Sequence, residues 1–113
     1  MARDIISLIG EAEDMVCEIA RECGGASRAR LALQYVRTCC GQYPDGTMPK
    51  DVVTACVERL QTRVVAYAYL SHGYMPTDEL VERCGALHAC TDAICDVLQG
   101  TQRVGANVRD GVN

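Results

Sequence analysis

The sequence predicts an all-α protein: a single-domain, four-helix up-and-down bundle followed by a C-terminal arm. Apolar residues recur three and four residues apart along most of the chain, which is the spacing of one face of an α-helix. Glycine and proline interrupt this pattern at regular intervals, and the phrase G-x-M-P-x-D occurs at residues 46–51 and again at residues 73–78. The length of 113 residues suits one domain built around one core.

The first half of the chain predicts two helices joined by a short turn. We expect the first helix over residues 2–23, ended by Gly24 and Gly25, and the second over residues 27–42, with Ser27 as its N-cap. The apolar face of the first helix comprises Ile5, Leu8, Ala12, Met15, Ile19 and Cys23. The second helix is apolar over more than half of its circumference and therefore needs neighbours on more than one side. Its apolar residues are Leu31, Ala32, Leu33, Tyr35, Val36, Cys39 and Cys40.

The repeated phrase predicts the starts of the third and fourth helices. Pro49 and Pro76 fit the first helical position, where a missing N–H costs nothing, and an aspartate follows each of them near the positive helix end. We expect helices over residues 49–71 and 76–99, ended by turns at Gly73 and Gly100. The apolar face of the third is Val53, Cys56, Val57, Leu60, Val64 and Tyr67. That of the fourth is Leu80, Cys84, Leu87, Thr91, Ile94 and Leu98.

The last residues have a different composition from the helices. Residues 101–113 space Val104, Val108 and Val112 among glycine and polar residues, which predicts a tail outside the bundle of residues 1–100. Such an arm could be held in place by lying on a neighbouring subunit.

Eight cysteines are the most unusual feature of the composition. In a reducing compartment we interpret them first as buried thiols that act as small hydrophobic residues. The second hypothesis is a site for a soft metal ion such as Cu(I) or Zn. Cys84 and His88 lie four residues apart on one helical face, with Cys90 and Cys95 close in sequence, although no C-x-x-C pair accompanies them. The third hypothesis is disulfides, which would have to join different helices.

Charge and motifs argue against several classes of function. The net charge is -4 without a run of basic residues, so we expect no nucleic-acid partner. No segment reaches the roughly 18 to 20 apolar residues that span a bilayer. The apolar run at residues 5–9 is too short for a secretory signal, so we expect a cytoplasmic protein without membrane contact. The sequence contains no phosphate-loop, dinucleotide-binding, nucleophile-elbow or zinc-protease motif. We therefore expect a protein that is not an enzyme and that binds no cofactor.

The hypothesis that remains is assembly. Val65, Tyr69 and Leu70 lie off the main apolar face of the third helix, and Tyr74 follows near its end. Apolar and aromatic residues outside the core suit a protein interface. We therefore predict a small helical structural or adaptor protein that acts through self-association, as a homo-oligomer, or through assembly with larger protein partners; a virion or phage component would have these traits. The alternative is a cysteine-rich bundle that binds a soft metal ion.

Overall fold

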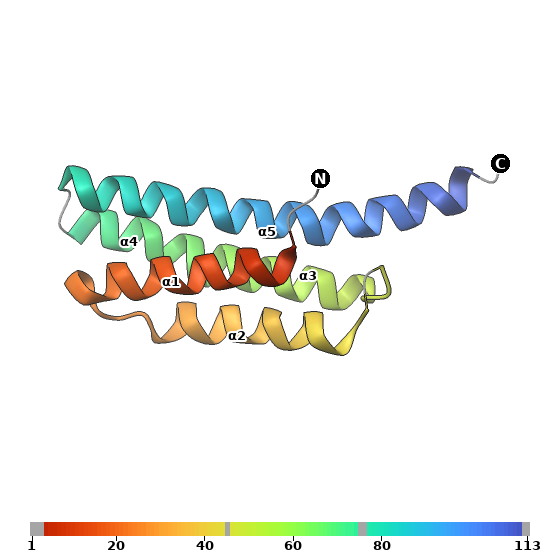
Figure 1. Cartoon of the computed structure of the whole chain (residues 1–113), viewed down its shortest axis with the longest axis horizontal. Coiled ribbons are helices and arrows are strands. Elements are labelled where there is room, and N and C mark those ends of the chain that lie inside the picture. The colour runs from red at the N-terminus through yellow and green to blue at the C-terminus, as the bar shows by residue number, and fades with distance from the viewer. Residues whose placement is uncertain (1–3, 45, 75–76, 112–113) are drawn as a thin grey trace.

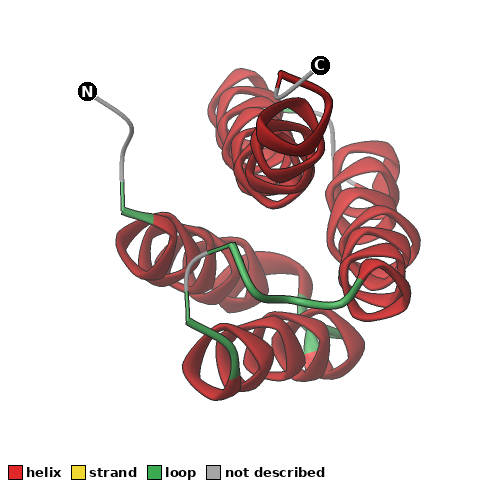
Figure 2. Ribbon diagram, turned by 90° about the vertical axis from the view of Figure 1, so that its right-hand side faces the viewer, coloured by secondary structure: helices red, strands yellow, loops and turns green. Residues whose placement is uncertain are grey.

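The computed structural model describes residues 4–44, 46–74 and 77–111, with the backbone alone described for residue 74 and residues 101–111. Within these residues every regular element is helical, and the helices surround one common centre, as Figure 2 shows in end view. The elements in chain order are α1 (Ile5–Cys23), α2 (Ser27–Gln42), α3 (Lys50–Arg59), the π-helix η1 (Leu60–Val65), α4 (Ala66–Tyr74) and α5 (Asp78–Gly111).

These elements form a four-helix up-and-down bundle, as the sequence predicts. The segments α3, η1 and α4 follow one another without a break and together make the third rod of the bundle (Figure 1). Around the bundle axis the order is α1, α2, the third rod and α5, so α2 and α5 lie diagonally opposite each other. None of the described helices combines the length and apolarity that a membrane span requires.

The predicted apolar faces of the third rod and of α5 are confirmed, because every residue assigned to them is buried. On α1 the buried face is rotated by part of a turn: Ile9 and Val16 are fully buried, whereas Ile5, Met15 and Cys23 are only partly so. The reason is that α1 packs against both α2 and α5, so its core face lies between the two contacts. On α2, Leu31 is exposed instead of packed.

The predicted bounds of α2 are confirmed, but several helix caps differ from the sequence prediction. Ser27 is the first helical residue and not the N-cap, which is Ala26 and has no side-chain hydrogen bond. Pro49 precedes α3 by one residue, and its carbonyl accepts a hydrogen bond from the Val53 amide at 3.0 Å. At the start of α5 the Thr77 hydroxyl accepts a hydrogen bond from the Leu80 amide at 3.2 Å, a cap that the sequence pattern did not reveal. The predicted role of Pro76 lies outside the described residues.

Two glycines that we expected to end helices do not do so. Gly73 lies within α4, and α5 continues through Gly100 to Gly111, so the prediction of a non-helical tail is wrong for residues 101–111. A glycine in a helix costs about 1 kcal/mol relative to alanine but does not stop the helix unless it adopts a left-handed conformation. Among the described glycines only Gly24, Gly25 and Gly46 have positive φ, and all three lie in turns.

The length of α5 sets the long dimension of the molecule. At a rise of 1.5 Å per residue its 34 residues span about 51 Å, close to the longest extent of 53 Å. Its C-terminal end therefore extends beyond the other helices (Figure 1). Residues 112–113 lie outside the described residues, and the function of the extension as an arm stays a prediction.

Candidate functional site

The most exposed large apolar side chains of the bundle lie next to each other on α4. Leu70 is 74% exposed and Tyr69 is 61% exposed, and Val81 on the neighbouring helix α5 is 40% exposed. Val65, the last residue of η1, is partly buried, and the side chain of Tyr74 lies outside the described residues. Of the four predicted interface residues, the structure thus presents two to solvent side by side.

A groove runs between α4 and α5, and Tyr69 and Val81 are among the residues that line it. Its volume is about 180 Å³, and it is lined by Ala68, Tyr69, His72, Val81, Cys84, Gly85 and His88, which we call the α4–α5 groove. The groove is open at Gly85, because a Cβ atom built there would meet nothing within 4 Å. The lining includes the small residues Ala68 and Gly85 as well as the rings of Tyr69, His72 and His88. We infer that a side chain from another molecule can enter this groove.

Two rings form one wall of the groove. The Tyr69 and His88 rings meet edge to face, with centroids 5.4 Å apart and an interplanar angle of 62°, a geometry that aromatic pairs favour. His88 Nε2 also lies 3.4 Å from Asp92 Oδ2, one turn further along α5. These contacts hold His88 against Tyr69 and fix the orientation of both rings.

The sequence analysis singled out three residues of this groove, but it assigned Tyr69 to the predicted interface and Cys84 and His88 to the predicted metal site. It missed His72, which we expected in a turn and which lies in α4, and it missed Val81 and Gly85. The signal was present in the sequence, because residues 81, 85 and 88 are spaced by four and three and so form a second face on α5. Only the packing of α4 against α5 shows that this face borders the exposed residues of α4.

The four residues of the predicted metal site do not converge. Cys84 and His88 line the same groove, but Cys90 points elsewhere and donates a hydrogen bond from Sγ to the Leu8 carbonyl at 3.3 Å. Cys95 follows Cys84 by eleven residues, which is about 16 Å along one helix. Within residues 4–44, 46–74 and 77–100, no group of three or more His, Cys, Asp and Glu side chains is arranged to hold a metal ion.

Burial dominates the chemistry of the cysteines. All eight lie within the described residues and carry thiols rather than disulfides, and Cys39, Cys56, Cys84, Cys90 and Cys95 are buried. Burial, together with the nearby Asp92 and Asp96 carboxylates, raises the pKa of Cys95 to about 11. Burial and then the neighbouring Cys23 raise the pKa of Cys84. Thiols of raised pKa stay protonated at neutral pH and are poor nucleophiles, which agrees with our first interpretation of the cysteines as core residues.

One group of thiols comes together across two helices. Burial is the largest cause that raises the pKa of Cys56 to about 12, and the neighbouring Cys39 thiol raises it further. The same Cys39 hydrogen-bonds with Tyr35, and this contact is the largest cause that raises the Tyr35 pKa. The Arg59 guanidinium lies 4.0 Å from the centroid of the Tyr35 ring. We call Tyr35, Cys39, Cys56 and Arg59 the α2–α3 thiol cluster.

Comparison with known proteins adds no family to these observations, since the chain matches no family model, no curated protein and no solved structure. Function must therefore be inferred from the chain's own residues.

Proposed function

We propose that this chain is a small, non-enzymatic helical structural protein that acts by associating with further copies of itself through α4. The observation that carries the proposal is the pair Tyr69 and Leu70, two consecutive large apolar residues that are mostly exposed, of which Tyr69 lines the α4–α5 groove. Single exposed apolar residues are normal on protein surfaces, but clustered ones next to a groove mark interaction sites.

We expect the contact between two copies to be two-fold symmetric. In such a contact the same patch occurs on both partners, so a protruding residue and a recess on one copy meet the recess and the protruding residue of the other. Leu70 is exposed on α4, and its neighbour in sequence, Tyr69, lines the α4–α5 groove together with Val81. An apolar cavity of about 150 Å³ accommodates a benzene molecule, so a groove of about 180 Å³ can accept a leucine side chain.

Burial of Leu70 in the groove of a second copy would contribute favourably to the free energy of association. Complete burial of one leucine side chain contributes about 1.5 to 3 kcal/mol, and a symmetric pair contributes twice. Aromatic side chains such as Tyr69 are also enriched at the centres of interfaces, where they bury much area with few rotatable bonds. The expected result is a reversible homodimer.

The test compares substitutions on this surface with one on a different surface. Leu70→Glu places a charge in the contact, and Gly85→Leu places an apolar side chain in the groove at a position where a Cβ atom would meet nothing within 4 Å. Leu31→Glu is the matched control, because Leu31 is 60% exposed on α2, diagonally opposite α5. We expect both surface variants to weaken self-association at least tenfold in sedimentation velocity, with unchanged helicity by circular dichroism.

Two results would contradict this assignment of the interface. One is a Leu70→Glu variant that associates as strongly as the unmodified chain. The other is a Leu31→Glu variant that loses association while Leu70→Glu retains it, because the contact surface would then lie on α2.

A further inference from the structure

We propose that the two histidines of the α4–α5 groove make self-association depend on pH, so that copies associate at neutral pH and separate in acid. This inference rests on the proposed function, because it concerns the same surface. His72 and His88 are the only histidines of the chain, and both line the groove that is to receive Leu70 of a second copy. Histidine is the side chain that commonly gains a positive charge between pH 8 and pH 5.

His88 is held at the groove by contacts with both of the helices that form it. Its ring meets the ring of Tyr69 on α4 edge to face, with the centroids 5.4 Å apart. Its Nε2 atom lies 3.4 Å from Asp92 Oδ2, one turn further along α5. The side chain of His88 is 38% exposed, so water reaches it in the single chain. A side chain that enters the groove from a second copy covers this exposed part.

Protonation changes the charge of a groove that is otherwise uncharged. The sequence of α4 contains no Asp, Glu, Lys or Arg, so His72 is the residue through which this helix gains charge. Burial raises the pKa of the Cys84 thiol in the same groove, and this thiol therefore stays neutral below pH 8. Acid thus brings two positive charges to a recess that is to be filled by a leucine.

The charges nearest to the groove on α5 offset only part of this change. Asp92 contacts His88, but its side chain is 59% exposed, and water weakens the attraction of exposed pairs. Asp96 follows four residues later, about 12 Å from His88 along the helix. Near the other end of the groove, Val81 is flanked in sequence by Asp78 and Glu82, and both of these residues are exposed.

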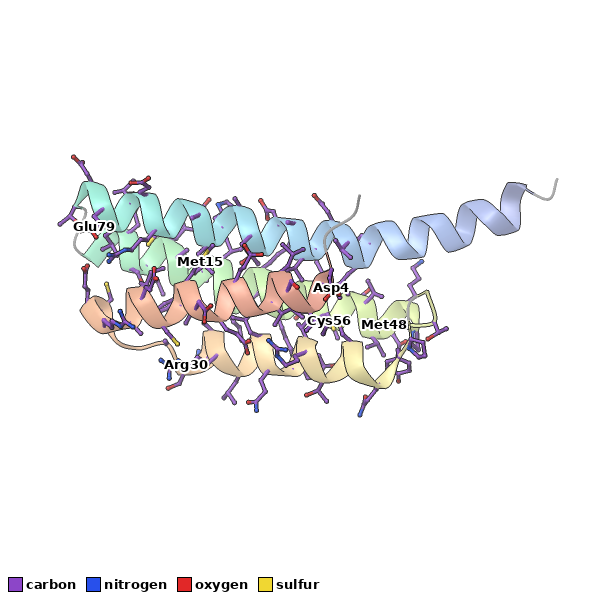
Figure 3. The ribbon with its side chains drawn as sticks, viewed as in Figure 1. Asp4, Met15, Arg30, Met48, Cys56 and Glu79 are labelled. Atoms are coloured by element: carbon purple, nitrogen blue, oxygen red, sulfur yellow. The ribbon has the colours of Figure 1, made fainter. Side chains whose placement is uncertain are left out.

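The charges of the other helices lie away from His88. The helix α1 contacts the side of α5 that carries Cys90, whose Sγ bonds to the Leu8 carbonyl, and two residues along a helix are nearly opposite each other. Its ion pair to α5 joins Glu22 to Arg83, which also pairs with Glu79, labelled in Figure 3 near the start of α5.

The third rod also keeps its charges away from this ring. On η1 the charged residue is Arg63, and it is exposed. The last charged residue of α3 is Arg59, which lies ten residues before Tyr69, about 15 Å along the rod.

The direction of the pH effect follows from proton linkage. A neutral ring can pack against an apolar partner, whereas a charged ring that loses its contact with water costs free energy. The associated copies therefore bind fewer protons than the separate chains, and acid favours the separate chains. The net charge of the whole chain gives the opposite expectation. It is -4 at pH 7 with a pI of about 5.0, so acid brings it towards zero, which promotes association.

The experiment measures the dissociation constant of the dimer by sedimentation equilibrium of the reduced full chain at pH 7.5 and pH 5.5, at equal ionic strength. We expect this constant to be at least about tenfold higher at pH 5.5. Circular dichroism at both pH values checks that the chain stays folded.

Two variants assign the effect to the groove. His88→Phe keeps a ring against Tyr69 that cannot take up a proton, and together with His72→Gln it removes both histidines. The ratio of the two dissociation constants should then fall to about one or below. Asp92→Asn removes the carboxylate beside His88 and should make the ratio larger than in the unmodified chain. A purely structural role of these residues would change the dissociation constant equally at both pH values and leave the ratio as it is.

The inference is overturned if association is equal or stronger at pH 5.5, or if the variant without histidines keeps the tenfold ratio. Either result leaves the proposed self-association in place, because copies still associate at pH 7.5. A chain that is monomeric at both pH values contradicts the proposed function itself, and this inference with it.

Discussion

At the scale of single residues, burial determines what each cysteine can do. Cys56 and Cys95 are buried, and burial is the largest cause that raises their pKa values to about 12 and about 11. Cys17 is the exposed member of the set, and Arg30 Nη2 donates a hydrogen bond to its sulfur at 3.5 Å. The same residue type thus occurs both as a core residue and as a surface thiol in one small domain.

The raised pKa of Cys95 makes stability depend on pH in the alkaline range. Below the pKa of the thiol in the unfolded chain, at about 8.5, both states keep the proton and the free energy of unfolding is constant. Above it the unfolded chain loses the proton while the folded chain keeps it until about pH 11, so the free energy of unfolding falls. We expect a loss of about 1.4 kcal/mol per pH unit from this group, and Cys56 adds a change of the same sign.

Urea unfolding of the reduced protein between pH 8 and pH 10 measures this dependence. In the Cys95→Ala variant, the free energy of unfolding should fall less steeply with pH, by the contribution of this one thiol. Any loss of stability that the substitution itself causes is already present at pH 8. An identical slope in the variant would show that Cys95 titrates alike in the folded and unfolded states.

The residues that face the core could be predicted from spacing alone, but pairs across helices could not. The three- and four-residue spacing placed Cys56 and Leu60 in the core, and both are fully buried. The same spacing assigned Cys39 and Cys56 each to a helical face without relating one face to the other. The influence of Cys39 on the pKa of Cys56, seventeen positions further along the chain, depends on how α2 and α3 are placed side by side, which no local pattern encodes.

At the scale of elements, the sequence signals for glycine were ambiguous. Gly24 and Gly25 both adopt φ of +66° and end α1, and the Gly24 carbonyl accepts a hydrogen bond from the Tyr67 hydroxyl at 2.7 Å. Gly100 follows an equally regular apolar pattern yet lies within α5. A glycine can either end a helix or lie within one, and tertiary contacts determine which of the two occurs. The C-terminal end of α5 could therefore not be predicted from the position of Gly100.

The π-helix is the element that no sequence signal indicated. We predicted one uninterrupted α-helix, because residues 53, 57, 60, 64 and 67 are spaced by four and three throughout. The structure instead has η1 between α3 and α4, while the buried residues remain those predicted. Apolar spacing therefore identified the face of this rod but not its local winding.

The continuity of α5 can be tested with one substitution. Because Gly100 is helical and a Cβ built on it would meet nothing within 4 Å, Gly100→Ala should raise stability by up to about 1 kcal/mol and increase helicity by circular dichroism. Gly41→Ala is a matched control within α2, where space is equally open. If Gly41→Ala stabilises the protein and Gly100→Ala does not, the helix ends near residue 100, as the sequence first suggested.

At the scale of the whole molecule, apolar packing holds the helices together and ion pairs contribute little. Arg37 of α2 pairs with Glu13 of α1, and Arg83 of α5 pairs with Glu22 of α1 and with Glu79. These pairs are at least partly exposed, and such pairs contribute about 0 to 1 kcal/mol each. The core contains neither Phe nor Trp and is closed by the aliphatic and cysteine side chains of all four rods. The exposed residues Tyr69 and Leu70 of α4 lie outside this core, and they are the surface that we propose for self-association.

Self-association itself is best measured by sedimentation equilibrium of the reduced, unmodified chain over a wide range of concentrations. If copies associate through α4, the mass at high concentration lies above that of the 12.3 kDa chain and falls reversibly towards 12.3 kDa on dilution. A mass of 12.3 kDa at every concentration up to the millimolar range would contradict self-association. The exposed Tyr69 and Leu70 would then have to be explained by a different protein partner.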